Sequence, residues 1–273
     1  MQEFVKSIIL GTVQGITEWL PISSTAHLLL LDEFLNVNLG GRAKELFFVI
    51  IQLASVLAVV VLYFTTLNPF ASSKGREEKR KTWQLLGKIV LATIPAGVIG
   101  LLIDDYVNTH LQRWTVIALA LFSYGLLYIY LEKGPLGKAK RRIVSLDSLG
   151  WNDAFFLGLF QTLALIPGTS RSGSTILGGI ILGLDRSIAA QFSFFMAIPV
   201  MAGASALKLY KLGFSYTKAE LSIIAVGFVT AFVVSLLVVK AMIAYIKRKD
   251  FSVFGYYRLL LAVAMTSYFL IWA

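Results

Sequence analysis

The sequence predicts an all-α integral membrane protein, in which six transmembrane helices and two re-entrant helical hairpins form an inverted-topology repeat. Three observations support this fold class. Of the 273 residues, 57% are hydrophobic, and the mean hydropathy is +0.77. Long apolar segments recur that can cross roughly 30 Å of hydrocarbon. Two further stretches are each split by a proline and a polar turn. We expect a single membrane domain, 1–273, with repeats at 1–131 and 151–273.

The first broken stretch comprises residues 1–20 and 24–35, on either side of Pro21. The second of these pieces is too short to cross the hydrocarbon. Polar residues and glycines interrupt the first piece: Gly11, Gln14, Gly15, Thr17 and Glu18. The pattern predicts a re-entrant hairpin. The start of the chain has no charged region and cleavage site typical of a secretory signal, so we expect this segment to stay in the mature protein.

The remaining apolar segments complete the topology. Spans are predicted at 46–64, about 83–103, 114–131, 187–210, 219–246 and 253–273. Between the third and fourth of these, residues 151–166 and 173–184 repeat the pattern of the first hairpin around Pro167. Tryptophans at the ends of predicted segments are typical of interface anchors: Trp83, Trp114, Trp151 and Trp272.

The distribution of charge predicts the orientation. The net charge is +10, but the basic residues cluster in short loops between apolar spans, which indicates a membrane protein and argues against nucleic acid as a partner. These loops lie near 65–82, 132–150 and 247–250, and the positive-inside rule makes them cytoplasmic. The connecting loop between the repeats is then cytoplasmic, and both termini lie outside. Because cysteine is absent, disulfides and thiolate metal sites are excluded.

Internal similarity predicts the repeat. Leu10-Gly11, Gln14 and Pro21 have counterparts in Leu157-Gly158, Gln161 and Pro167, and hydroxyl residues follow both prolines. Each half crosses the membrane an odd number of times, so the second half is inverted and its hairpin enters from the opposite side. The two tips can then meet near the midplane, where inverted-repeat membrane proteins place their sites. The alternative is a chance resemblance between two segments interrupted by glycine and proline.

The first tip carries the strongest candidate residue, Glu18. It is the only acidic residue well inside an apolar region, and Gln14 shares its helix face. Glu18 could ligate Mg²⁺ or Ca²⁺ with Gln14 as a neutral co-ligand, or orient His27 or a hydroxyl as part of a base system. Less functional interpretations stay open: Glu18 paired with Arg171 in a structural ion pair, Ser24 as a helix cap, and His27 as a packed side chain.

The second tip indicates an anion site. At each tip a proline ends one short helix and hydroxyl residues can cap the next, so two helix N-termini would converge with Arg171 beside them. A guanidinium suits phosphate or carboxylate. The alternative is a Gly/Ser turn in which Arg171 reaches a carbonyl or a lipid headgroup. No Gly-x-x-x-x-Gly-Lys-Ser/Thr loop is present, so nucleotide hydrolysis is not expected.

These two motifs closely resemble those of the bacterial undecaprenyl-diphosphate phosphatase family, known also for bacitracin resistance. The resemblance rests on Gln14 and Glu18, on Pro21 to His27 and on Pro167 to Thr175. It extends to Phe47 to Gln52 and Gln191 to Phe194. Gln14 stands where some members carry glutamate, which bears on the number of carboxylates at the metal.

The resemblance implies a phosphatase of the bacterial plasma (inner) membrane that removes the terminal phosphate of undecaprenyl diphosphate and recycles this lipid carrier for cell-wall synthesis. It implies an active site reached from the outer face, a divalent cation held by Glu18 and Gln14, and, as a further expectation, a homodimer. Ser24 would be the nucleophile, His27 the acid–base group, and Glu18 and Arg171 catalytic. The implied substrate-binding residues are Ser23, Thr25, Ser170, Arg171, Ser172 and Thr175. A phosphorylated Ser24, a phosphorylated His27 and a directly attacking water all stay open.

Two other classes of protein compete with this interpretation. Inverted repeats, broken helices and midplane charges describe a secondary transporter equally well. Glu18 would then be a coupling carboxylate, and the lipid monophosphate could be the cargo. A passive membrane scaffold would leave both polar breaks unexplained.

Overall fold

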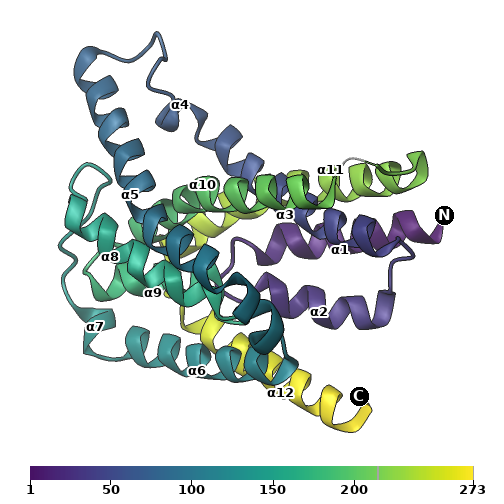
Figure 1. Cartoon of the computed structure of the whole chain (residues 1–273). Coiled ribbons are helices and arrows are strands. Elements are labelled where there is room, and N and C mark those ends of the chain that lie inside the picture. The colour runs from purple at the N-terminus through teal and green to yellow at the C-terminus, as the bar shows by residue number, and fades with distance from the viewer. Residues whose placement is uncertain (214, 273) are drawn as a thin grey trace.

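The computed structural model describes residues 1–213 and 215–272, and its regular structure is helical apart from one isolated bridge between Ile143 and Leu184 (Figure 1). The long helices are α3 (Gly41–Leu62), α5 (Arg76–Tyr106), α6 (Trp114–Lys133), α10 (Arg186–Leu212), α11 (Lys218–Ile246) and α12 (Ser252–Trp272). The shorter ones are α1 (Gln2–Thr17), α2 (Ser24–Leu35), α4 (Phe64–Leu67), α7 (Pro135–Lys138), α8 (Trp151–Thr162) and α9 (Arg171–Ile181). A π-helical turn, η1 (Val107–Leu111), and a 3₁₀ turn, η2 (Leu163–Leu165), complete the set.

Six helices of the described chain are long and apolar enough to cross a membrane, and they are the six expected from the sequence. The chain is therefore a multi-pass membrane protein. Helix α5 begins at Arg76, several residues before the apolar segment that predicted it. Its first turns are polar, and the Glu78 carboxylate accepts a hydrogen bond from the Gly75 N–H at 3.1 Å. Hydropathy detects only the part of a helix that faces lipid. The anchor predicted at Trp272 lies outside the described side chains.

The two broken stretches form helix pairs that approach the centre from opposite sides of the molecule (Figure 1). Their turns meet there, since Glu18 of the first turn contacts Arg171 at the second. The prediction that hydroxyls cap the second helix of each pair is confirmed. Ser23 Oγ accepts from the Ala26 N–H at 3.4 Å, and Ser170 Oγ accepts from the Gly173 N–H at 3.2 Å.

Both capping serines have the same unusual backbone conformation. The φ angle is 72° at Ser23 and 71° at Ser170, in the left-handed region that residues other than glycine rarely adopt. Such a conformation costs about 1–3 kcal/mol and persists where the surrounding structure enforces it. The two turns are thus alike in geometry as well as in sequence.

Each broken pair packs on a long helix of the other half through a glycine. A Cβ at Gly11 of α1 would lie 2.7 Å from the Gly227 carbonyl oxygen of α11, and a Cβ at Gly158 of α8 would lie 2.6 Å from the Ala92 carbonyl oxygen of α5. Helices that approach this closely require small residues at the contact. The glycines therefore set the position of α1 and α8, and through them the position of the two turns.

We expect Gly158→Ala to lower the Tm of the purified protein by several degrees. The added methyl group has only the Ala92 backbone to displace, and overpacking of this kind costs about 1–3 kcal/mol. The measurement is thermal unfolding in detergent. Gly203→Ala in α10 is the control, because in the described chain nothing beyond the local backbone of its own helix lies within 4 Å of the added Cβ. Equal Tm values for the two variants would contradict this account of the α5 and α8 contact.

The three basic loops lie at one end of the molecule. Lys81 pairs with Asp147 at 2.8 Å and Lys133 pairs with Asp250 at 3.1 Å, which joins the first turns of α5 to the loop before α8, and the end of α6 to the loop before α12. Both termini lie toward the other end (Figure 1). This arrangement agrees with the predicted topology, in which all three loops share a side. The assignment of that side to the cytoplasm stays a prediction from the positive-inside rule.

Candidate functional site

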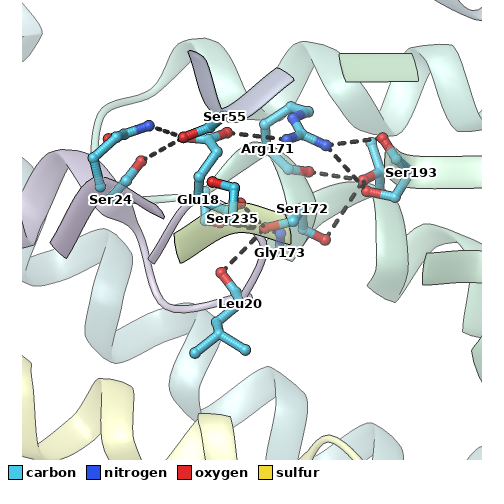
Figure 2. A network of polar contacts seen from close by, with 12 residues as sticks. Glu18, Leu20, Ser24, Ser55, Arg171, Ser172, Gly173, Ser193 and Ser235 are labelled. Carbon is cyan, nitrogen blue, oxygen red and sulfur yellow. Dashed lines mark hydrogen bonds and ion pairs between the residues drawn. The ribbon is translucent and has the colours of Figure 1, made fainter. Parts of the chain in front are cut away.

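The carboxylate of Glu18 is the centre of the polar cluster between the two turns (Figure 2). Glu18 is 8% exposed. Its Oε1 accepts a hydrogen bond from Arg171 Nη2 at 3.0 Å, and its Oε2 accepts from Ser24 Oγ at 2.9 Å and from Gln14 Nε2 at 3.1 Å. One carboxylate therefore joins the first helix break to the second.

The local backbone explains how the first break brings these groups together. Helix α1 ends at Thr17, and the Glu18 N–H still donates to the Gln14 carbonyl, so the two side chains share one helix face. After the break, Ser23 and not Ser24 caps α2. The capping role that the sequence allowed for Ser24 is thus taken by its neighbour. This leaves the Ser24 hydroxyl, on the first residue of α2, to donate to Glu18.

Arg171 occupies the corresponding first position of α9 and is held on three sides. Besides the ion pair with Glu18, its Nη1 donates to the Ser193 carbonyl at 2.8 Å, and its guanidinium lies 5.5 Å from the centre of the Trp19 ring. Sequence analysis left open two structural roles for Arg171, an ion pair with Glu18 and a contact with a backbone carbonyl. The structure contains both contacts. The hydroxyl of Ser24 on the same carboxylate shows that the pair belongs to a larger cluster.

Two predicted substrate-binding residues, Ser172 and Thr175, form hydrogen bonds around this cluster. Ser172 Oγ donates to the Leu20 carbonyl at 3.2 Å, across the two breaks. Thr175 Oγ1 donates to the Arg171 carbonyl at 2.8 Å and lies 2.6 Å from Ser193 Oγ. Neither residue lines the adjoining cavity. In this conformation they fix α9 against α10 and against the first break.

The cavity beside the cluster has a volume of about 210 Å³. All the other predicted polar site residues except Gln14 and His27 line it: Glu18, Ser23, Ser24, Thr25, Ser170 and Arg171. Two amides that sequence reasoning did not assign to the site, Gln52 and Gln161, also lie in its wall, and apolar side chains form the rest. The sequence did point to Gln161, because it is the counterpart of Gln14 in the internal repeat.

His27 is the candidate that the structure does not bring to Glu18. Its Nδ1 lies 2.7 Å from the Ser23 carbonyl oxygen and its Nε2 lies 2.7 Å from Tyr257 Oη, with the two rings stacked. The histidine lines a separate apolar groove between α1 and α12. For His27 to act as an acid or a base on a ligand beside Glu18, the imidazole ring would have to leave Tyr257.

The side-chain oxygens of Glu18 and Gln14 fit a divalent cation that takes its other ligands from a bound phosphate. The described residues contain no cluster of three or more acidic, histidine or cysteine side chains that could hold a metal ion alone. Glu18 supplies one carboxylate, and Gln14 Oε1 is buried without a hydrogen-bond partner among the described residues. Mg²⁺ is commonly bound by one or two carboxylates, waters and substrate phosphates. Glu18 and Gln14 could therefore hold such an ion once a phosphate supplies further oxygens.

The cluster can in principle bind an anion and accept a proton. The first N–H groups of α2 and α9 have no partners within their helices, and both N-termini border the cavity beside Arg171. Glu18 accepts the Ser24 hydroxyl proton in a hydrogen bond, which is the geometry required of a general base. Anion binding and hydroxyl activation thus meet at one wall of the cavity.

Fold and site together define a multi-pass membrane protein with a buried polar cluster at the meeting point of two helix breaks. Residues 7–264 match the family model described as bacitracin resistance protein BacA, and the chain belongs to this family. Similar proteins include "Undecaprenyl-diphosphatase" of Desulfitobacterium hafniense (49% identity, 98% of this chain and 96% of the relative) and "Undecaprenyl-diphosphatase 1" of Clostridioides difficile (50% identity, 98% and 96%). "Undecaprenyl-diphosphatase" of Acetivibrio thermocellus is 47% identical over 99% of both chains.

Proposed function

We propose that this protein hydrolyses undecaprenyl diphosphate to undecaprenyl phosphate and inorganic phosphate. The observation that carries the proposal is the Glu18, Ser24 and Arg171 cluster at the wall of a cavity, in a chain whose relatives are named for this activity. The cluster supplies what phosphoryl transfer chiefly needs, which is positioning and neutralisation of charge. The apolar exterior suits a prenyl chain.

In the proposed reaction, Arg171 and the N-termini of α2 and α9 bind the terminal phosphate. The attacking oxygen forms a bond to the terminal phosphorus, and the bond from phosphorus to the bridging oxygen breaks. The bridging oxygen keeps the electron pair and leaves as part of undecaprenyl phosphate. Glu18 takes the proton of the attacking hydroxyl. Glu18 and Gln14 would hold a divalent cation, which would supply further positive charge for the diphosphate.

Ser24 is the proposed nucleophile, because its hydroxyl donates to Glu18 at 2.9 Å while the His27 ring is held by Tyr257. A phosphoserine formed in this step would be hydrolysed by water in a second step. Direct attack by a water that Glu18 activates is the alternative with the same base. His27 stays a proposed acid–base group, and attack by His27 is the third route.

The proposed membrane topology rests on how residues 1–131 and 151–273 are arranged. We infer that each broken pair is a re-entrant hairpin and that the halves form an inverted repeat, supported by the matching caps at Ser23 and Ser170 and by the packing of Gly11 and Gly158. The protein would lie in the bacterial plasma (inner) membrane with its site open to the outer face, recycle the lipid carrier for cell-wall synthesis and confer bacitracin resistance. A homodimer stays a prediction from family resemblance.

The deciding experiment is phosphate release from undecaprenyl diphosphate by purified protein in detergent. We expect release to stop with EDTA, to return with Mg²⁺ or Ca²⁺, and to fall by at least about a hundredfold in Glu18→Gln. Detergent elution and Tm show whether the variant is folded. No release by folded wild-type protein with any cation would overturn the proposal and favour transport, which liposome assays would then test.

A separate prediction concerns the nucleophile. We expect Ser24→Ala to abolish release, because Ser24 is the one residue of the described chain whose hydroxyl donates to the Glu18 carboxylate. Rapid quenching with ³²P-labelled substrate should label Ser24 in the wild-type protein. Ser222→Ala in α11 is the control, since this exposed hydroxyl donates to the Lys218 carbonyl of its own helix and does not line the cavity. A loss of only a few fold in Ser24→Ala, or label on His27, would contradict nucleophilic attack by Ser24.

A further inference from the structure

A second feature of the molecule involves a buried lysine far from the Glu18 cluster. Lys88 lies in α5 and is 7% exposed. Among the described residues it has neither a hydrogen bond nor an ion pair, and its one specific contact is the face of Trp151, whose ring centre lies 5.9 Å from Nζ. The side chain is thus almost enclosed while its ammonium group has no paired anion, and the contact with Trp151 offsets only part of the cost of removing this charge from water.

The acidic residues nearest to Lys88 are committed to other groups. Asp147 pairs with Lys81 at 2.8 Å. Asp153 pairs with Arg142 at 2.6 Å and also accepts a hydrogen bond from the Gly150 N–H at 2.8 Å. These two aspartates and the three basic residues around them, Lys81, Lys88 and Arg142, carry a net charge of one positive unit. The uncompensated charge is that of Lys88, whose side chain is the most buried of the five.

Lys88 lines a cleft of about 400 Å³ between the first turns of α5 and the loop before α8. The other charged residues of this cleft have partners: Lys74 donates to two carbonyls and to Thr82, Glu77 pairs with Arg80, and Glu78 accepts from the Gly75 N–H. Its remaining wall comes from Thr66, Gln84, Leu85 and Leu146. Lys88 is thus the one charged residue of this polar cleft that has neither an ion pair nor a hydrogen bond among the described residues, and it is 7% exposed.

The surroundings of the cleft indicate which anion would fill it. It lies at the end of the molecule that carries the basic loops, which the positive-inside rule places on the cytoplasmic side. Trp83 and Trp151, both about half exposed, mark the predicted membrane interface there, and Val90 is exposed farther along the same helix. A phosphate at this depth with acyl chains along α5 would belong to a lipid. Basic pockets between helices on this side of a membrane suit anionic headgroups.

We propose that this cleft binds the phosphate of an anionic phospholipid of the cytoplasmic leaflet, with Lys88 as its central cation and Lys81 at its rim. The site is separate from the Glu18 cluster and does not depend on the proposed phosphatase activity. Bound lipid would fix the loop before α8 to α5, and α8 leads into the second helix break.

The test measures the rise in Tm that phosphatidylglycerol gives to protein in a neutral detergent, compared with phosphatidylcholine and with inorganic phosphate. We expect phosphatidylglycerol alone to raise the Tm, and Lys88→Met to lose at least half of this rise while Lys88→Arg keeps it. Lys249→Met is the matched control, an exposed lysine in another basic loop of the same end. Each variant is compared only with itself without lipid, so a change in basal stability does not affect the result.

Asp147→Asn provides a second readout at an exposed residue, where folding is not at risk. Removing this carboxylate frees Lys81 and should increase the rise in Tm with phosphatidylglycerol. The proposal is overturned if Lys88→Met and Lys249→Met respond to the lipid alike. It is overturned equally if inorganic phosphate stabilises the protein as much as the lipid does. Should Lys88→Met fail to fold, the absence of any gain in Asp147→Asn would overturn it.

Discussion

Arg171→Ala is expected to lower phosphate release by about a thousandfold or more. Arg171 is the single cation within hydrogen-bond distance of Glu18 among the described residues, and it lines the cavity in which the terminal phosphate is proposed to bind. A guanidinium that neutralises charge on a transferring phosphoryl group typically contributes 10³ to 10⁵ in rate. The measurement is phosphate release under saturating cation, with kcat and KM determined separately. We expect kcat to carry most of the loss.

The same substitution leaves Glu18 buried without its cationic partner, so a loss of activity could reflect a loss of structure. Breaking a buried pair from one side typically costs about 3–5 kcal/mol. The double variant Glu18→Gln with Arg171→Met removes both charges and should regain the Tm that Arg171→Ala loses, without regaining turnover. Arg248→Ala, at an exposed arginine of a basic loop, should change neither quantity. Turnover within tenfold of wild type in folded Arg171→Ala would exclude Arg171 from the reaction.

Most of the fold could be predicted because lipid imposes a simple rule on sequence. A spanning helix must be apolar over its whole membrane depth, so hydropathy finds it, and the bounds 24–35 for α2 agree with the structure. The errors lie where helices leave the membrane. Helix α3 begins at Gly41, ahead of the predicted 46, and α5 begins at Arg76, ahead of 83. Their first turns are polar, so helix capping and not apolarity determines where they begin.

The candidate site was predicted in part because its residues lie in two compact motifs. Local spacing placed Gln14 beside Glu18, and the prediction of an inverted repeat placed Arg171 near both. Spacing could not show that Ser193, in α10, would hold the Arg171 guanidinium, because that contact depends on how distant helices pack. It also could not show which way His27 turns. The partner of that ring, Tyr257, is 230 residues away in the chain.

Arg258 is the important residue that sequence reasoning missed altogether. It lies in α12 and is 0% exposed. Its Nη1 donates to the Pro21 carbonyl at 3.1 Å and its Nη2 donates to the Gly168 carbonyl at 2.8 Å, so one guanidinium binds the backbone of both helix breaks. A single arginine near the start of an apolar span resembles an interface residue, and only the tertiary structure shows it pointing inward.

We expect Arg258→Met to lower the Tm more than any other substitution considered for this chain, and to abolish phosphate release with it. A proline-broken turn has carbonyls that no helix can satisfy, and each buried carbonyl left without a donor costs about 1–3 kcal/mol. Arg258 also reaches the Ala120 carbonyl and lies 5.4 Å from the centre of the Tyr124 ring, so the loss extends to the contact between α12 and α6. Thermal unfolding in detergent measures the effect, with Arg248→Met as the exposed control.

The Arg258→Lys variant distinguishes the contribution of the guanidinium geometry from that of the positive charge. An ammonium keeps the positive charge but lacks the planar fork that reaches carbonyls on two separate turns, so we expect intermediate stability and poor turnover even at temperatures where the variant is folded. If Arg258 supplied only charge, the lysine variant would behave like wild type. If it were a passive core residue, methionine of similar volume would be tolerated. Because Arg258 is placed where both breaks meet but does not line the Glu18 cavity, its effect on catalysis should appear only together with a change in Tm.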